Sequence, residues 1–564
     1  MATDSVPLED AGAAVQPRAS WVPMIVIAMA QILMVFNVSA LQVSIEAISS
    51  SFGVPATSIG TAIVTYALVV AGLILLGARI VEIYGSRLVF RLGVGMFGAA
   101  MAVMAASYGM LTAVIAQVVA GAAAALLVPT LVVLIAENYR GPQQTKALAW
   151  LGGSAAMGVV LAFLIAALLT GWIGWRLTFG LLVLLAAALY KLSERFAPPE
   201  PQSGVSIDTF GVVLAAAAIF SISVGANNLT DWGALLAGPG APFAILDMSP
   251  APIMMLGGIF LGQAFVSWSR RRASVGKSPL VALEVIDTRE ERAALFSIFT
   301  ISAFASAITF LIPLYIQVVQ GRSSLETAAA VIPFSLASFA AAVLVVRLLD
   351  RMSPRNTARY AFLAVAVGVA LLGTVIRNDW SDATVILGMV MIGLGEGALV
   401  SLLFNVLVTA SPKELAGDVG SLRGTINNLA TGVGTAVAST LVVALLGASV
   451  HRELVHNEVI PLALKTEINL DRVSFVSNEQ LRSRLTQTAA TAEEVAEAAR
   501  INTDARLLAL KVTFYGLAGL ALLAYFPAGA LPGRVRIAAE GGEAGRRARG
   551  ETPAGTTPAG GVPA

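Results

Sequence analysis

The chain has 564 residues, of which 57% are hydrophobic and 12% are charged, and its formal net charge is +2. Soluble domains carry about 25% charged residues, so this composition excludes a soluble globular protein and indicates a polytopic, all-α membrane protein. The near-neutral charge does not suggest nucleic-acid binding. The chain has no cysteine, which excludes disulfides, thiol chemistry and cysteine-based zinc sites.

Apolar segments long enough to cross a bilayer, which takes about 20 residues per helix, recur along the whole chain. Residues 1–20 are polar and lack a basic region before the first apolar segment. We therefore predict a cytoplasmic N-terminal segment followed by an uncleaved first span. The fourteen predicted spans are 21–43, 59–79, 88–108, 111–136, 147–169, 175–192, 210–229, 250–269, 293–317, 325–346, 359–377, 382–410, 425–448 and 509–529.

Lysine and arginine gather in alternate short loops, for example at 270–277, whereas the loops 44–58 and 230–249 contain neither residue. The positive-inside rule places the basic loops, and with them both termini, on the cytoplasmic side. Residues 533–564 are rich in Gly, Ala, Pro and Arg, and we predict a disordered cytoplasmic tail there.

One long loop, 449–508, lies on the outer side in this topology. Two capping-box patterns, Ser477-x-x-Gln480 and Thr491-x-x-Glu494, predict two short helices, the second continuing into the last span. The loop could recognise a partner, extend an exit path or be a plain structural extension. Its two histidines, which we interpret as solvated residues rather than metal ligands, are His451 and His456.

Two inner loops carry a repeated pattern, "RIVEIYGSR" (79–87) and "RLLDRMSPR" (347–355), with Arg at positions one and nine and an acid at position four. Such groups at a helix end can latch neighbouring helices in one state and release them in another. An interfacial anchor is the simpler reading, but a second copy indicates duplicated halves, as in many transporters. The candidate inner-gate residues are Arg79, Glu82, Arg87, Arg347, Asp350, Arg351 and Arg355.

Together these features resemble the fourteen-span drug:proton antiporter branch of the major facilitator superfamily. The resemblance implies alternating access between two six-helix bundles, 21–195 and 291–530, with two linker helices at 209–270. It also implies a small substrate bound between the bundles. The stretches that carry it are "GWRLTF" (174–179), "IPLYIQVVQGRSSLETAAAVIP" (312–333), "GLGEGA" (393–398) and "GDVGSLRGTINNLATGVGTA" (417–436).

The N-terminal half departs from the pattern of that branch. Asn37 stands where the family usually has an Asp, and Gln117 stands where it has an Arg. In the first inner loop, Glu82 and Ala78 replace the usual Asp and Gly. The N-terminal half thus lacks the charged pair that relatives are thought to use for proton coupling. The fifth-span Gly-Pro…Gly-Gly signature is also missing, its positions being Ala162, Phe163, Ala166 and Ala167.

Glu396, between Gly395 and Gly397, lies near the centre of an apolar run. A charge at membrane depth costs roughly 2.5–3.5 kcal/mol on insertion scales, so an acid there is a functional candidate. Desolvation favours the neutral form of a carboxyl group, and a cavity opening to each side in turn would move a proton. The flanking glycines permit close helix approach. The alternative is a Glu that only holds helices together by hydrogen bonding.

Other polar residues are candidates for the substrate or proton pathway, with helix–helix hydrogen bonding or interfacial placement as the alternative for each. Arg423 could pair with Asp418 or simply anchor its helix. The remaining candidates are Asn37, Ser39, Gln42, Glu46, Gln117, Gln317 and Asn427.

We therefore predict a monomeric secondary transporter in a bacterial plasma membrane that exports lipophilic or amphipathic compounds, with proton coupling through Glu396. The low charge of the predicted cavity argues against a highly charged substrate. No nucleotide, metal or catalytic motif is present, so no cofactor and no enzymatic activity are expected. The alternatives are an uncoupled transporter of a lipid-like or metabolite substrate, and a non-transporting sensor or scaffold whose partner site is the loop 449–508.

Overall fold

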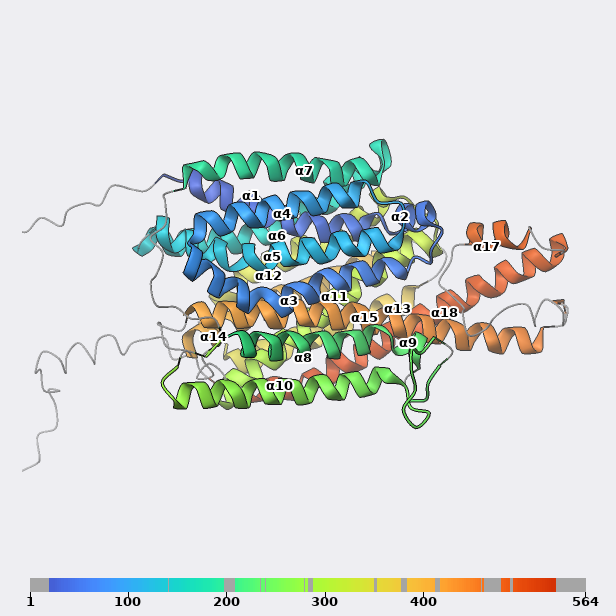
Figure 1. Cartoon of the computed structure of the whole chain (residues 1–564). Coiled ribbons are helices and arrows are strands. Elements are labelled where there is room, and N and C mark those ends of the chain that lie inside the picture. The colour runs from blue at the N-terminus through green and yellow to red at the C-terminus, as the bar shows by residue number, and fades with distance from the viewer. Residues whose placement is uncertain are drawn as a thin grey trace, which may run out of the picture.

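Long helices run side by side along one axis of the molecule (Figure 1). This computed structural model describes residues 20–139, 141–196, 208–233, 235–238, 240–277, 279–281, 288–348, 352–376, 383–410, 416–457, 459–460, 478–486 and 490–533.

The described residues of the first half of the chain fold into helices that correspond to the first eight predicted spans, with three additional short helices, α2, η1 and α9. Glycines with positive φ, Gly85 and Gly174, separate consecutive helices where the chain turns sharply. These elements are α1 (Val22–Val43), α2 (Ile45–Phe52), α3 (Ser58–Tyr84), α4 (Ser86–Ala105), α5 (Met110–Asn138), α6 (Gly141–Ile173), α7 (Trp175–Leu192), η1 (Ser193–Arg195), α8 (Thr209–Asn227), α9 (Leu229–Trp232) and α10 (Pro250–Ser274).

The second half contains the other six predicted spans and one short π-helical turn. A capping box formed by Thr288 and Glu291 opens its first helix. The elements are α11 (Arg289–Leu314), the π-helix η3 (Tyr315–Val319), α12 (Ser324–Leu348), α13 (Pro354–Val375), α14 (Ala383–Ala410), α15 (Ala416–His456), α17 (Asn478–Leu485), α18 (Ala492–Ala524) and the 3-10 turn η6 (Pro527–Ala530).

Every predicted span falls on a helix. Within the described residues, thirteen helices are long and apolar enough to cross a membrane. The fourteenth predicted span, 147–169, lies in α6, where 158–173 form a shorter apolar stretch. One span was predicted too short, because α15 runs beyond 425–448 at both ends. The early start of α18 agrees with the prediction that the second loop helix continues into the last span, and the loop 44–58 contains the short helix α2, which was not predicted. Hydropathy locates only the apolar part of a helix, whereas polar helix formers lengthen it into water.

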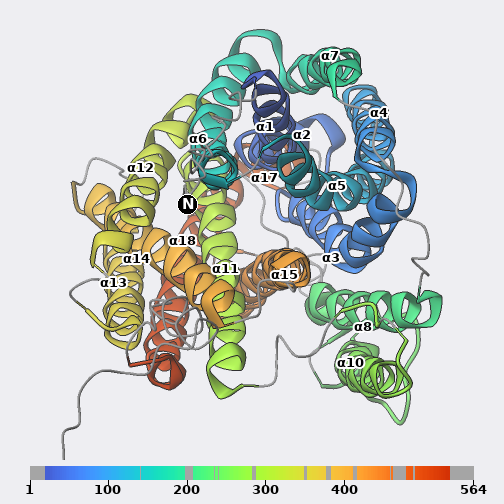
Figure 2. The same cartoon turned by 90° about the vertical axis from the view of Figure 1, so that its left-hand side faces the viewer.

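Two groups of helices face each other (Figure 2). We call α1–α7 the N-half and α11–α18 the C-half. The halves meet along two seams, where α3 packs on α15 and α6 packs on α12. Helices α8 and α10 lie beside the α3–α15 seam, and α8 contacts both of its helices.

Asp208 fastens α8 to α10. Its carboxylate caps α8 by accepting from the Gly211 N–H at 3.0 Å, and it also accepts from Trp268 Nε1 of α10 at 3.0 Å. The Arg272 guanidinium lies 3.5 Å from the same carboxylate. A buried carboxylate needs such partners, so the α8–α10 pair behaves as one hairpin.

The end of α15, the start of α18 and α17 project beyond one end of the bundle (Figure 1). We call this projection the extension and that end of the molecule the extension end. Leu454, Ile460 and Ile501 form a small apolar core there. Hydrogen bonds from Arg500 and Asn457 lower the pKa of Glu497 to about 2. The described chain begins and ends at the opposite end of the bundle.

Both helices predicted in the loop 449–508 are present as α17 and the start of α18. The capping box of Thr491 and Glu494 forms as predicted. The predicted cap Ser477 lies outside the described residues.

Candidate functional site

Glu396 occupies the middle of α14 and is half-buried. Its carboxylate accepts a hydrogen bond of 2.5 Å from the Ser338 hydroxyl of α12. A carboxyl group held by one hydroxyl, with no arginine or lysine bonded to it among the described residues, can bind and release a proton without first breaking an ion pair. Sequence reasoning selected Glu396 but did not identify Ser338.

Glycines surround Glu396 on two faces of α14. A Cβ atom on Gly397 would overlap the Ser338 carbonyl, and one on Gly393 would overlap the Phe334 carbonyl, both on α12. A Cβ atom on Gly395 would lie 2.5 Å from the Ala361 carbonyl of α13. The backbones approach closely because these residues have no side chain, and this approach brings Ser338 within reach of the acid.

Asn37 of α1 and Gln117 of α5 form a closed amide pair. Asn37 Nδ2 donates to Gln117 Oε1 at 2.8 Å, and Gln117 Nε2 donates to Asn37 Oδ1 at 3.2 Å. Both side chains are completely buried. The two positions that depart from the family's charged pair thus lie in contact, and they form a neutral pair in its place.

Gln42, Glu46 and Gln317 meet at the extension end, where the two halves touch. Gln317 Nε2 donates to the Gln42 carbonyl at 3.2 Å, and Gln317 Oε1 accepts from the Glu46 N–H at 3.1 Å. Gln42 Nε2 also donates to the Thr309 hydroxyl of α11 at 3.3 Å. The Glu46 carboxylate accepts from Ser50. These hydrogen bonds connect α1 and α2 of the N-half to α11 and η3 of the C-half.

At the opposite end, Arg79 joins α3 to the segment that leads into the C-half. Its guanidinium forms an ion pair with Glu82 at 2.8 Å and donates to the carbonyls of Pro279 and Leu280 at 3.1 and 3.4 Å. Both side chains are only partly exposed. Two of the predicted gate residues are therefore paired, and one of them, Arg79, also contacts a segment distant in sequence.

The ninth residues of the two repeats make the same kind of contact. Arg87 Nη2 donates to the Glu194 carbonyl in η1, which follows α7, and Arg355 Nε donates to the Leu531 carbonyl after η6, which follows α18. Each arginine therefore ties the start of its own helix, α4 or α13, to the segment that follows the last long helix of its half. Arg347 lies in α12, but its side chain is not among those described. Asp350 and Arg351 lie outside the described residues.

Among the remaining candidates, Ser39 is buried in α1. Asn427 of α15 is exposed, and its Oδ1 accepts from Ser302 of α11 at 2.9 Å. Arg423 is half-buried one turn earlier on α15. The side chain of its suggested partner, Asp418, lies outside the described residues.

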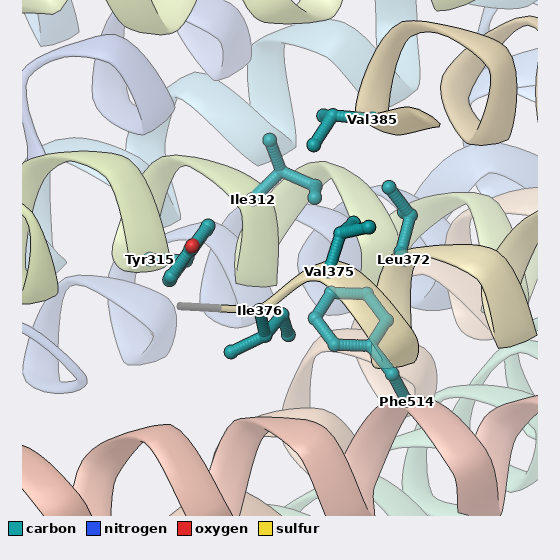
Figure 3. Close-up of a pocket in the computed structure, with 7 residues that line it drawn as sticks. All are labelled: Ile312, Tyr315, Leu372, Val375, Ile376, Val385 and Phe514. Carbon is teal, nitrogen blue, oxygen red and sulfur yellow. The ribbon is translucent and has the colours of Figure 1, made fainter. Parts of the chain in front are cut away.

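A small cavity lies within the C-half, between α11, α13, α14 and α18 (Figure 3). Its lining is apolar except for Tyr315, whose hydroxyl accepts from Gln320. None of the predicted pathway residues lines it. This cavity therefore belongs to the packing of the C-half and not to the region between the halves.

A family model described as the Major Facilitator Superfamily matches residues 27–435. The chain belongs to this superfamily. It is 27% identical over 447 residues to the probable actinorhodin transporter of Streptomyces coelicolor, covering 76% of this chain and 73% of that protein. It is also 27% identical to the lincomycin resistance protein of Streptomyces lincolnensis, covering 64% and 70%. The puromycin resistance protein pur8 of Streptomyces alboniger is 26% identical, covering 75% and 81%.

Solved structures of facilitator proteins share this fold. A bacterial homolog of the human lysosomal transporter Spinster, in an inward-facing and unoccupied conformation, superposes with a TM-score of 0.56 at 12% identity, covering 91% of this chain and 97% of that one. An auto-inhibited peptide transporter of the POT family gives a TM-score of 0.57 at 13% identity, covering 90% and 96%. The predicted fold class is thereby confirmed.

Proposed function

We propose that this facilitator protein is a proton-coupled exporter of lipophilic or amphipathic small molecules. The observation that carries the proposal is the half-buried acid Glu396 at mid-span, bonded to Ser338 and free of any ion pair among the described residues. The names of the relatives, which refer to an actinorhodin transporter and to lincomycin and puromycin resistance, support export of such compounds.

In the proposed cycle, the N-half and C-half move as two bundles about a substrate site between them. The neutral Asn37–Gln117 pair holds the N-half together without taking up a proton. Glu396 takes up a proton when its surroundings open to one side and releases it when they open to the other. The protein acts as a monomer without a cofactor or chemical catalysis.

The proposed orientation follows from the lysine and arginine bias. Basic loops lie at the end of the bundle opposite the extension, which supports a cytoplasmic location for both termini and a location of the extension outside a bacterial plasma membrane. Export then means release toward the extension end.

The test is flux in liposomes loaded with a lipophilic cationic dye, with and without a proton gradient, for wild type, Glu396→Gln and Ser338→Ala. We expect the gradient to accelerate efflux by wild type and Ser338→Ala, because both keep the carboxyl group. Glu396→Gln should retain only gradient-independent movement. Gradient-driven efflux by Glu396→Gln at the wild-type rate would make Glu396 a packing residue and refute proton coupling through it.

A further inference from the structure

The first span is broken near the extension end. Helix α1 ends at Val43 and α2 begins at Ile45. In an unbroken α-helix the Gln42 carbonyl would accept from the Glu46 N–H, because those groups are four residues apart. Here the Gln317 carboxamide bonds to both groups instead. It donates to the Gln42 carbonyl at 3.2 Å and accepts from the Glu46 N–H at 3.1 Å. A side chain inserted into the helical ladder is a recognised cause of such a break.

Gln317 comes from the opposite half and belongs to the π-helix η3. Its side chain is 2% exposed, so water does not compete for the two hydrogen bonds. Pro313 lies just before η3 and has no N–H, which weakens the preceding α-helical turn. Short π-helical turns are frequent at functional sites. The backbone of η3 is thus shaped to present Gln317 to the break in the other half.

Arg506 of α18 binds the π-helix from its other side. Its guanidinium donates to the carbonyl of Val318, the residue after Gln317, at 3.0 Å. It also donates to Asn478 Oδ1 of α17 at 2.7 Å and to the Asn502 carbonyl at 3.2 Å. Arg506 is completely buried, and a buried charge must be hydrogen-bonded. The conformation of η3 is therefore tied to the base of the extension.

The extension also reaches the N-half directly. Gln480 Nε2 of α17 lies 3.3 Å from the Ser50 hydroxyl of α2. The extension therefore contacts both η3 and α2, the two elements that Gln317 joins.

We propose that Gln317 is a clamp that closes the extension end, and that Arg506 is the positioning residue that holds η3 in the conformation that presents it. The proposal rests on alternating access between the halves. Opening breaks both bonds of the clamp, but Gln42 and Glu46 can then bond to each other as α1 and α2 join into one helix. The exchange of partners keeps the cost of opening small, as a gate that opens in every cycle requires.

The absence of native cysteines allows a direct test with single-cysteine variants. Thr435 of α15 is 1% exposed, and it packs with Phe310 around Gly60 at the extension end of α3. Thr435→Cys should react with a membrane-impermeant maleimide from the extension end only while that end is open. The reaction is followed in membrane vesicles whose outer face carries the extension. A separate variant, Ser483→Cys in α17, identifies that orientation, because its cysteine reacts with the reagent only when the extension faces outward. The labelling rate is measured without a substrate or a proton gradient, so it is independent of whether the protein exports drugs.

In the Thr435→Cys background, Gln317→Leu should accelerate labelling roughly tenfold, because two hydrogen bonds no longer oppose opening. Arg506→Gln should accelerate labelling roughly threefold, and Arg506→Lys should give a rate between those of wild type and Arg506→Gln. Adding Arg506→Gln to Gln317→Leu should give no further increase. Arg500→Gln is the matched control, because Arg500 is exposed on the same helix and bonds only Glu497 and Asp504 among the contacts described. It should label at the wild-type rate.

Unchanged labelling in Gln317→Leu would refute the clamp. Acceleration by Gln317→Leu but not by Arg506→Gln would support the clamp and refute the positioning role of Arg506. Additive effects of the two substitutions in the double variant would also refute the positioning role. If Arg506→Gln does not fold, Asn478→Ala tests the same connection, because it removes one acceptor of the guanidinium from the α17 side. It should also accelerate labelling.

Discussion

The two halves of the protein share a framework but differ in the polar groups at their centres. In the N-half, Arg87 bonds to the segment that follows the last long helix, and in the C-half Arg355 does the same. At mid-span, however, the N-half contains the sealed amide pair of Asn37 and Gln117, whereas the C-half contains the half-buried acid Glu396. The repeated arginines thus make similar contacts in the two halves, whereas the polar side chains described at mid-span differ.

A charged pair could both hold helices together and change its protonation, whereas here these two properties belong to different side chains. An amide pair satisfies its own hydrogen bonds and does not change charge with pH, so it contributes cohesion alone. A carboxyl group bonded to one serine is less constrained and can alter its protonation. Three pairs of substitutions test how far the halves are equivalent.

The largest expected effect concerns the glycines that allow close packing in both halves. A Cβ atom on Gly397 would overlap the Ser338 carbonyl in the C-half, and one on Gly77 would overlap the Ala125 carbonyl in the N-half. Gly397→Val and Gly77→Val should both lose most folded protein in detergent extracts, measured by fluorescence size-exclusion chromatography, because overpacking costs about 1–3 kcal/mol or more. Gly519→Val, with no neighbour within 4 Å, is the control and should fold. Normal folding of either packed variant would contradict the described approach.

A smaller loss is expected at the central polar pairs, and it should differ between halves. Asn37→Leu leaves the amide of Gln117 buried without its partner, which costs about 1–3 kcal/mol. Ser338→Ala should cost less, because Glu396 is only half-buried and water can replace the hydroxyl. Thermal unfolding in detergent measures both. Equal losses would show that the two centres are packed alike and remove the contrast drawn above.

The smallest effect is expected at the repeated arginines. Arg87→Gln and Arg355→Gln each remove one hydrogen bond from a partly exposed side chain, so each should lower stability by about 1 kcal/mol or less. The two values should agree within error if the repeat is structurally equivalent. A loss of stability several times larger at one site would mean that the two arginines do not make equivalent contributions and that the repeat is not structurally equivalent.

Hydropathy in the sequence predicts each of the thirteen helices that are long and apolar enough to cross a membrane within the described residues, because the bilayer requires long apolar segments. The same signals could not extend α15 to His456 or place α2, since polar helical turns outside a bilayer leave no hydropathy signature. Polar residues inside apolar runs led to Glu396, Asn37 and Gln317 individually. Their partners could not be derived, because a contact such as Asn37 with Gln117 joins positions 80 residues apart.

Arg506 shows the same limit most clearly. In the sequence it is one of several charged residues in a polar segment, next to exposed neighbours such as Arg500. Nothing in its local pattern distinguishes a buried guanidinium from a solvated one, and only the fold brings it to the carbonyl of Val318.

The placement of α8 has a mechanical consequence. Because α8 contacts both α3 and α15, and Asp208 fastens it to α10, the hairpin braces one seam between the halves. Among the described helices, no comparable brace covers the seam of α6 and α12 (Figure 2). The two seams are thus unequally supported by neighbouring helices. The α3–α15 seam is therefore overlaid by a helix that contacts both of its members, whereas the α6–α12 seam has no such helix over it among the described residues.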